Sequence, residues 1–212
     1  MIRINRLDFY DVKMKYIRDL HNADSHVMSQ SPQVNKDTRR YIGIIMVFNE
    51  HKYCIPISSG TKTKFQEKKN QVDLIKIPDV EKKDKNGAFK TLAVLNINNM
   101  IPVDDSVVVK VDLRDCAGDS IPQRQRKGLL RKELNWCRDN YDLIERRVLK
   151  VYKLVTETPE KNRNLTRRSC NFKRLEAVLN SYISKQSTKE NTTEKNLRHE
   201  TSFKHKSSKK KK

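Results

Sequence analysis

Glycine and long apolar runs are scarce in this sequence. The 212 residues include only five Gly, and neither a GxGxxG nor a Walker A pattern is present, which excludes the usual nucleotide and dinucleotide fingerprints. No stretch approaches the roughly 18 consecutive apolar residues of a transmembrane helix, and the N-terminus lacks the apolar core of a secretory signal. These absences predict a cytoplasmic protein that has no membrane partner and no nucleotide cofactor.

Residues arranged to hold a metal or form disulfides are also lacking. The four cysteines are far apart, without a C-x-x-C pair or a nearby paired histidine, so free thiols are expected rather than a zinc site or a disulfide framework. Carboxylates such as Asp73 have no partner at metal-site spacing, and the five histidines form no acid–base pair. We therefore expect neither a metal nor another cofactor.

Acidic residues are in deficit. The chain has 46 Lys and Arg against 26 Asp and Glu, a formal net charge of +20. Residues 186–212 carry nine Lys and Arg against three Glu, and the rest of the chain is still strongly basic. Such a balance favours contact with nucleic acid, because cationic side chains displace the counterions of the phosphate backbone. A purely electrostatic binder of the ribosomal kind would have the same composition.

Apolar periodicity predicts an α+β fold with the strands first. A strand at residues 6–10 precedes a helix that Asp11 caps, and YIGIIMVF and KYCIPIS read as a hairpin whose first strand is buried on both faces. Charged residues 80–90 suggest a turn, and residues 161–168 suggest a basic loop. Further strands and then helices are expected at residues 72–77, 92–97, 107–113, 129–140, 144–155 and 171–182.

The number and spacing of the strands suggest a small antiparallel barrel elaborated by helices. Periodicity stops after Ser184, and the remaining residues are rich in Ser, Thr, Asn and Lys. We expect one domain over residues 1–185 and a disordered, Lys-rich tail over residues 186–212. The tail can serve as a solubilising end or attract RNA without specificity.

One segment combines hydroxyls, cations and a glycine at the end of a strand. Ser58, Ser59, Gly60, Thr61 and Lys62 follow the apolar strand KYCIPIS, and such a set can surround the oxygens of a phosphate. An ordinary Ser/Gly turn has the same composition. Basic residues just before the first hairpin strand can face the same place or be a solvated charge run, namely Lys36, Arg39 and Arg40.

Five blocks of the sequence resemble the ToxN/AbiQ endoribonuclease toxins of type III toxin–antitoxin systems. They are FYDVKMKYIRDL, RYIGIIMVFNEHKYCIPISS, LAVLNINNMIPV, RKGLLRKELNWCRDN and NFKRLEAVLNSY, in the order and spacing of that family. The most specific signature is Y-I-G-I followed by H-K-Y-x-x-P-[ILV]-[ST]-S and later by N-x-x-x-M-I-P. The resemblance spans residues 6 to about 184 and leaves out the tail.

The resemblance implies a core akin to the MazF/Kid toxins and cleavage of RNA without a metal. The products would carry 2′,3′-cyclic phosphate and 5′-hydroxyl ends. It further implies a repetitive antitoxin RNA that the toxin processes, and whose pseudoknots close a protein–RNA ring across the active site. Cellular and phage RNA would be the substrates, and abortive infection against phage the biological role.

The resemblance also implies the site residues. The family's catalytic hydroxyl pair corresponds to Ser58 and Ser59, and its cation before Y-I-G-I to Arg39. The family's loop lysine corresponds either to Lys62, one position on, or to Thr61 in its place. Grip on the RNA backbone is expected from basic residues around the site and in three loops, namely Lys36, Arg40, Lys64, Lys68, Lys69, Lys82, Lys83, Arg163, Arg167 and Arg168.

Two alternatives remain. A noncatalytic RNA-binding protein can have the same fold and charge, and a MazF-like mRNA interferase would be paired with a protein antitoxin. Mutation of Ser59 separates an enzyme from a binder. A tandem-repeat tract upstream of the gene would argue for an RNA antitoxin, and a gene for a small acidic protein against it.

Overall fold

The computed structural model describes residues 7–28, 41–48, 51–60, 65–66 and 71–186, with the side chains of residues 41–48 left out. Its β-strands are β1 Phe9–Val12, β2 Tyr41–Phe48, β3 His51–Ser59, β4 Leu74–Lys83, β5 Phe89–Asn96, β6 Ile101–Val103 and β7 Val108–Lys110. Its helices are α1 Met14–Ala23, α3 Ile121–Asp139, α4 Tyr141–Thr156, α5 Arg163–Arg167, the short 3₁₀ helices η1 Ile97–Asn99, η2 Asp105–Val107 and η3 Pro159–Asn162, and a C-terminal helix described over residues 172–186.

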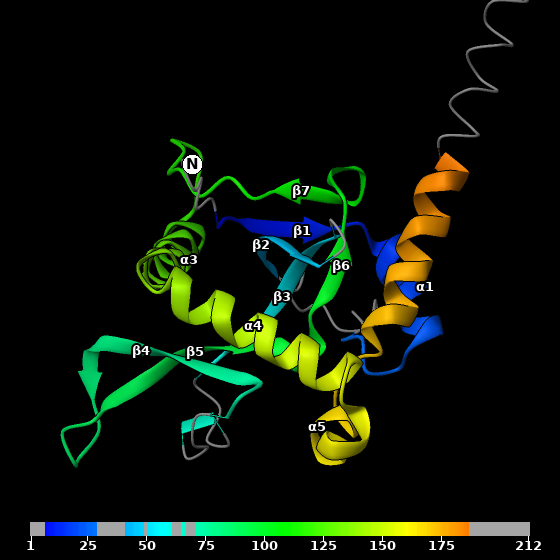
Figure 1. Cartoon of the computed structure of the whole chain (residues 1–212). Coiled ribbons are helices and arrows are strands. Elements are labelled where there is room, and N and C mark those ends of the chain that lie inside the picture. The colour runs from blue at the N-terminus through cyan, green and yellow to red at the C-terminus, as the bar shows by residue number, and fades with distance from the viewer. Residues whose placement is uncertain (1–6, 29–40, 49–50, 61–64, 67–70, 187–212) are drawn as a thin grey trace, which may run out of the picture.

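The strands form one antiparallel sheet in the order β4-β5-β3-β2-β1-β7, with β6 added beside β3. One edge of β3 pairs with β2, whereas its other edge is divided between two partners. Residues 52–54 pair with β6 and residues 57–59 pair with β5. The β4–β5 hairpin therefore leaves the rest of the sheet at β3 and projects from the body, as Figure 1 shows at the lower left.

The α+β class is confirmed, but within the described part of the chain the sheet does not close into a barrel. β4 and β7 are the two ends of the strand order and do not pair with each other. β4 is longer than the alternating segment 72–77 predicts, because its ladder with β5 continues to Lys83. The turn predicted over residues 80–90 is thus confined to the tip of this hairpin, where Gly87 has a φ of 79°.

Several local predictions are corrected by the structure. Asp11 lies in β1 rather than capping α1, whose N-cap is Lys13, because the first strand runs on to Val12. Residues 101–103, which lie between the strands predicted at 92–97 and 107–113, pair with β3 as a further strand. Residues 161–168 fold into η3 and α5, since Leu165 is buried and anchors a helical turn. The helix at 129–140 begins earlier, at Ile121, after a capping box of Ser120 and Gln123.

Helices cover the sheet and complete the apolar core. The inward faces of α1, α4 and the C-terminal helix match the predicted periodicity, with buried residues such as Ile17, Ile144 and Leu175. Asn171 caps the C-terminal helix as expected, its Oδ1 accepting the Arg174 N–H at 3.1 Å. Figure 1 shows this helix beside α1, and Tyr16 and Tyr182 meet there edge to face.

A buried carboxylate links three elements of this core. The Glu176 Oε1 atom accepts hydrogen bonds from Tyr53 Oη at 2.8 Å and Tyr152 Oη at 2.6 Å, and Lys173 pairs with Oε2 at 3.1 Å. Although burial alone would raise the pKa of Glu176, these bonds hold it below its ordinary value. The carboxylate thereby ties β3 to α4 and to the C-terminal helix.

Parts of the predicted organisation lie outside the described residues. The Lys-rich tail, the turn at residues 49–50 and most of the loop before β2 belong to these parts, and the side chains of β2 do as well. The domain boundary at residue 185 stays a prediction. Among the described helices, none is both long and apolar enough to cross a membrane.

Glu133 should make stability depend on pH. It is 5% exposed on the inner face of α3, and burial raises its pKa from 4.5 to about 7. The native state therefore binds more protons than the unfolded state between these values, so stability should fall as the pH rises from about 4.5 to 7. Replacing Glu133 by Gln should remove that slope and add roughly 2 kcal/mol at pH 8. Urea unfolding over this pH range measures it, with the exposed Glu157→Gln as the control; equal slopes in all three proteins would contradict it.

Candidate active site

The predicted hydroxyl pair lies at the end of β3, where that strand pairs with β5. Ser58 is opposite Val94 and Ser59 is opposite Ala93. Because successive side chains of a strand point to opposite faces, the two hydroxyls leave the backbone on different sides. Ser59 is exposed and Ser58 is partly buried. The strand end thus carries one exposed serine and one serine that is partly buried against the sheet.

The Ser58 hydroxyl is fixed by a neighbour on β5. Asn96, only 8% exposed, donates from Nδ2 to Ser58 Oγ at 3.2 Å and to the Pro56 carbonyl at 3.4 Å. Asn96 is two residues beyond Val94, the cross-strand partner of Ser58, and so lies on the same face of the sheet. A buried amide therefore defines the position of one of the two serines.

Gly60 brings the backbone after the serines against β5. Its N–H donates to the Leu92 carbonyl at 2.9 Å, and a Cβ at this position would lie 2.4 Å from the Thr91 carbonyl oxygen. The close approach requires glycine. The sequence left open whether Gly60 belongs to a phosphate-binding segment or to an ordinary turn. In the structure, the absence of a side chain at Gly60 allows the end of β3 to pack against β5.

The side chain of Gln66, a few residues after the serines, hydrogen-bonds to Gly60 and to Thr91 of β5. Gln66 donates from Nε2 to the carbonyls of Gly60 and Thr91, and its Oε1 accepts the Thr91 N–H at 2.9 Å. Lys76 of β4 donates to the Gln66 carbonyl at 2.8 Å. The segment that begins at Ser58 is therefore anchored to the β4–β5 hairpin at both Gly60 and Gln66.

The predicted site residues before β2 and directly after the serines in the sequence lie outside the described residues. They are the cations Lys36, Arg39, Arg40, Lys62, Lys64, Lys68 and Lys69, and Thr61. Their roles stay predictions. Arg39 and Arg40 directly precede β2, and β2 is paired with β3 along Tyr41–Pro56, close in register to the serines.

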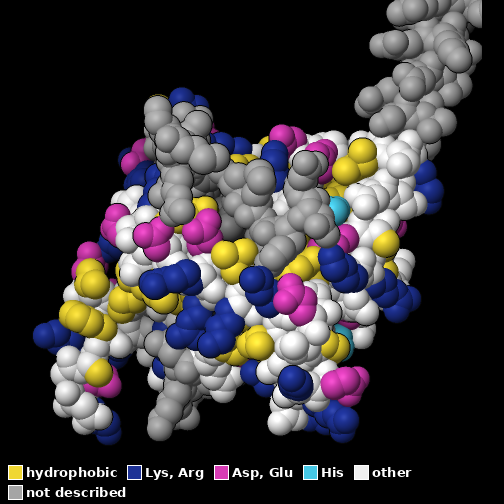
Figure 2. Space-filling model, viewed as in Figure 1, with side chains coloured by type: hydrophobic (Ala, Val, Ile, Leu, Met, Phe, Trp, Pro, Cys, Tyr) yellow, Lys and Arg dark blue, Asp and Glu magenta, His cyan; other side chains and the backbone are white. Residues whose placement is uncertain are grey.

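The other predicted RNA-binding residues are described and exposed. Lys82 and Lys83 end β4, where Lys82 lies 3.7 Å from Asp79 and Lys83 lies over the Phe89 ring. Arg163 and Arg167 project from α5, which Figure 2 shows among dark-blue basic side chains on the face that also carries α4. Their charges face solvent, as backbone contacts require.

Arg168, in contrast, is engaged within the protein. Its Nε and Nη2 atoms bind the two carboxylate oxygens of Asp73 at 2.7 and 3.0 Å, and Asp73 is only 3% exposed just before β4. The hydrogen bonds that Arg168 donates to the Asp73 carboxylate raise the pKa of Arg168 above its ordinary value. Arg168 joins α5 to the start of the β4–β5 hairpin, and any RNA contact would share its guanidinium with that carboxylate.

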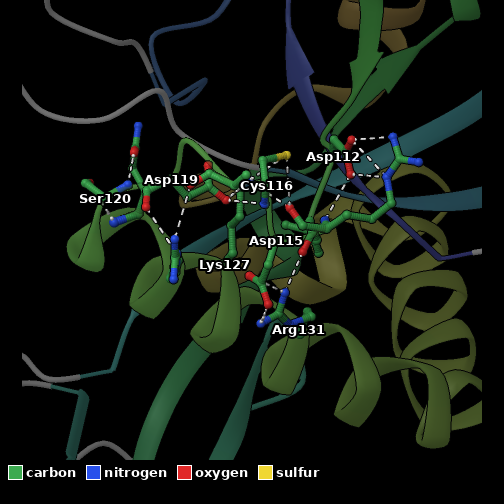
Figure 3. A network of polar contacts seen from close by, with 12 residues as sticks. Asp112, Asp115, Cys116, Asp119, Ser120, Lys127 and Arg131 are labelled. Carbon is green, nitrogen blue, oxygen red and sulfur yellow. Dashed lines mark hydrogen bonds and ion pairs between the residues drawn. The ribbon is translucent and has the colours of Figure 1, made fainter.

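A second cationic region lies between β7 and α3, away from the predicted residues. A cavity of about 660 Å³ is lined there by the cations Lys110, Arg114, Arg131 and Arg138 and by apolar Val111, Leu113 and Leu134. Each of the four cations is paired with a carboxylate, of Asp8, Asp112 or Asp115. Figure 3 shows how the Arg131–Asp115 and Lys127–Asp119 pairs bind the segment after β7 to α3. The charges serve to fix that segment.

Asn96 and Gln66 were not among the predicted site residues. Asn96 opens the N-x-x-x-M-I-P signature on which the family resemblance partly rests, so its position was visible while its contact with Ser58 was not. Nothing in the sequence indicated a role for Gln66, because its partners Gly60 and Thr91 are far apart in the chain and come together only in the folded sheet.

Together, the antiparallel α+β fold, the hydroxyls at a strand end and the basic surface define a class of proteins suited to phosphodiester chemistry on RNA. The family Toxin ToxN, type III toxin-antitoxin system, matches residues 8–180, and the chain belongs to this family.

Relatives of known name cover most of the chain. It is 30% identical over 188 residues to the endoribonuclease ToxN of Bacillus thuringiensis subsp. kurstaki, covering 86% of this chain and 87% of that protein. It is 28% identical over 189 residues to the endoribonuclease AbiQ of Lactococcus lactis subsp. lactis, covering 86% and 92%. The family assignment made from the sequence blocks is thereby confirmed.

Two solved structures share the fold. One, from work on selective toxin inhibition by a non-coding RNA pseudoknot in type III systems, superposes with a TM-score of 0.68 at 27% identity. The other is AbiQ, a lactococcal anti-phage endoribonuclease of a type III system, with a TM-score of 0.68 at 26% identity. Each similarity covers 84% of this chain and 98% of the other.

Replacing Gly60 by Ala should disturb the strand end that carries the serines. The added Cβ meets the backbone of Thr91, which cannot move without parting β3 from β5, so we expect a loss of about 1–3 kcal/mol in unfolding free energy. RNA cleavage should fall as well. Gly118→Ala is the matched control, because nothing lies within 4 Å of its Cβ position. Urea unfolding measures both variants, and equal stability would show that the close approach does not constrain the site.

Arg168 and Arg167 should separate folding from RNA contact. Arg168→Ala leaves the Asp73 carboxylate buried without its guanidinium and should cost about 2 kcal/mol of stability. Arg167→Ala should leave stability within ~0.5 kcal/mol while weakening RNA binding and its dependence on salt. Thermal unfolding and filter binding at two salt concentrations test the pair. The assignment fails if Arg168→Ala is as stable as the wild type.

Proposed function

We propose that this protein is the metal-independent endoribonuclease toxin of a type III toxin–antitoxin system, acting in the cytoplasm. The family assignment and the curated relatives named endoribonuclease support the activity. The hydroxyl pair held at the end of β3 against β5 is the structural observation that carries the proposal. The core is proposed to be akin to that of the MazF/Kid toxins, although the sheet of the described strands is open.

The reaction is a transesterification within RNA. The ribose 2′-oxygen attacks the adjacent phosphorus and loses its proton, while the bond to the 5′-oxygen breaks and that oxygen gains a proton. The products are a 2′,3′-cyclic phosphate and a 5′-hydroxyl. Negative charge accumulates on the pentacoordinate phosphorus, so preorganised hydroxyls and cations accelerate the step without a metal.

Each predicted residue has a role in this scheme. Ser59, the exposed serine of the pair, contacts the scissile phosphate, and Ser58 is the second hydroxyl of the catalytic pair. Arg39 neutralises the developing charge, and Lys62, or Thr61 in its place, serves the phosphate or the leaving oxygen. Loss of one such donor typically costs about a hundredfold or more in rate.

The remaining basic residues bind the RNA backbone. Lys82 and Lys83 on the β4–β5 hairpin and Arg163 and Arg167 on α5 are exposed cations at separate points of the surface. Spread in this way, they suit a folded RNA better than one extended strand. The proposed set is completed by Arg168 and by cations that precede β2 or follow the serines in the sequence, namely Lys36, Arg40, Lys64, Lys68 and Lys69.

The antitoxin is proposed to be a repeated RNA pseudoknot that the toxin cuts from a precursor and that then closes a protein–RNA ring over the site. Support comes from the similar structure in which a non-coding RNA pseudoknot inhibits the toxin. Phage defence by abortive infection follows from the similarity to AbiQ, which is described as anti-phage.

The proposal is tested by incubating purified protein with a cellular RNA pool in EDTA and determining the fragment ends. Discrete cuts ending in 2′,3′-cyclic phosphate are expected from the wild type and from Ser184→Ala, an exposed control serine on the C-terminal helix. Ser59→Ala should lose at least about a hundredfold in rate while still binding RNA.

Intact RNA that is nevertheless bound would replace the enzyme with an RNA-binding relative of the toxins. Cleavage that is neutralised by a small acidic protein, with no repeat tract near the gene, would favour the MazF-like alternative.

A further inference from the structure

The contact between Asn96 and Ser58 determines in which direction the serine proton points. The Pro56 carbonyl can only accept a hydrogen bond, so the Asn96 group that lies 3.4 Å from it must be the NH₂ rather than the carbonyl oxygen. The same nitrogen is 3.2 Å from Ser58 Oγ. Asn96 therefore donates to Ser58, and the orientation of the amide is fixed by a third, independent group.

A hydroxyl that accepts a hydrogen bond becomes a better donor. The lone pair of Ser58 Oγ that faces Asn96 is occupied, so its O–H proton is directed away from the amide. Polarisation along such a chain of hydrogen bonds strengthens the outer bond, and the effect is larger where water is excluded. Because Asn96 is buried and Ser58 is partly exposed, the chain runs from the protein interior toward the site.

We propose that Asn96 is a positioning residue that holds the Ser58 hydroxyl as a hydrogen-bond donor to the scissile phosphate. The inference rests on the proposed function and adds a residue to the same site. It assigns Ser58 the role of donor to the phosphate rather than of acceptor for the 2′-hydroxyl proton. Asn96 itself does not touch the RNA.

A double-mutant cycle separates this role from simple support of the β3–β5 pairing. Asn96→Leu removes the amide with little change in volume, and its single-turnover cleavage rate should fall about a hundredfold with KM within about threefold. In the Ser58→Ala background the same substitution should change the rate by less than about twofold, because the hydroxyl through which Asn96 acts is gone. Thermal unfolding is recorded for every variant.

The matched control is Asn99→Leu. Asn99 also donates its amide to a backbone carbonyl, that of His26 at 2.9 Å, but it lies in η1 and has no hydrogen bond to Ser58 among the described residues. Its cleavage rate should stay within about twofold of wild type.

Asn96→Asp supplies a readout that no purely structural role would move, and it retains volume and polarity should the leucine variant fail to fold. Above the pKa of the introduced carboxyl, the carboxylate accepts the Ser58 proton and turns the hydroxyl away from the phosphate. Below it, the neutral carboxyl can donate as the amide does. The ratio of variant to wild-type rate should therefore rise as the pH is lowered.

The inference is overturned if Asn96→Leu retains cleavage, if it costs as much in the Ser58→Ala background as in the wild type, or if the Asn96→Asp ratio is flat with pH. Each of these outcomes requires a wild type that cleaves. A wild type that binds RNA without cutting it refutes the proposed function instead, so the two failures are distinguishable.

Discussion

The sheet depends on β3, whose two halves have different neighbours along one edge. Residues 52–54 hold β6 and residues 57–59 hold β5, while β2 runs along the opposite edge. The partner along this edge therefore changes between Cys54 and Ile57, and the second half of β3 belongs to the β4–β5 hairpin as much as to the main sheet. The serines stand on this second half, so their orientation is set by the hairpin.

The first half of β3 is fixed from the opposite side. Tyr53 is buried in the core and its hydroxyl donates a hydrogen bond to Glu176, which also accepts one from Tyr152. Replacing one member would leave buried polar groups unpaired, a cost of about 1–3 kcal/mol each. The strand is thus clamped to the helices at one end and to the hairpin at the other, which suits a site that works by preorganisation rather than by closure.

The sequence predicted the local secondary structure and the family correctly. It did not predict features that depend on contacts between segments far apart in the chain. Periodicity identified the β2–β3 hairpin and the helices, and the quoted blocks identified the ToxN family. The open sheet of the described strands could not be foreseen, because it depends on which distant strands pair, and β4 and β7 do not pair with each other. Arg167 and Arg168 could not be distinguished as RNA contacts from the sequence, because the ion pair between Arg168 and Asp73 forms only in the folded chain. Asn96 joined the site in the same way, through strand register.

Gln66 completes the sheet where β3 ends. Its amide donates a hydrogen bond to the Thr91 carbonyl and accepts one from the Thr91 N–H, as the backbone of a neighbouring strand would. On the other edge of β5, Pro78 of β4 lies opposite Thr91. A strand with unpaired N–H and C=O groups is a template for pairing with other chains. A side chain that occupies this position therefore keeps the Thr91 groups on this edge of β5 from pairing with another chain, without adding a further strand.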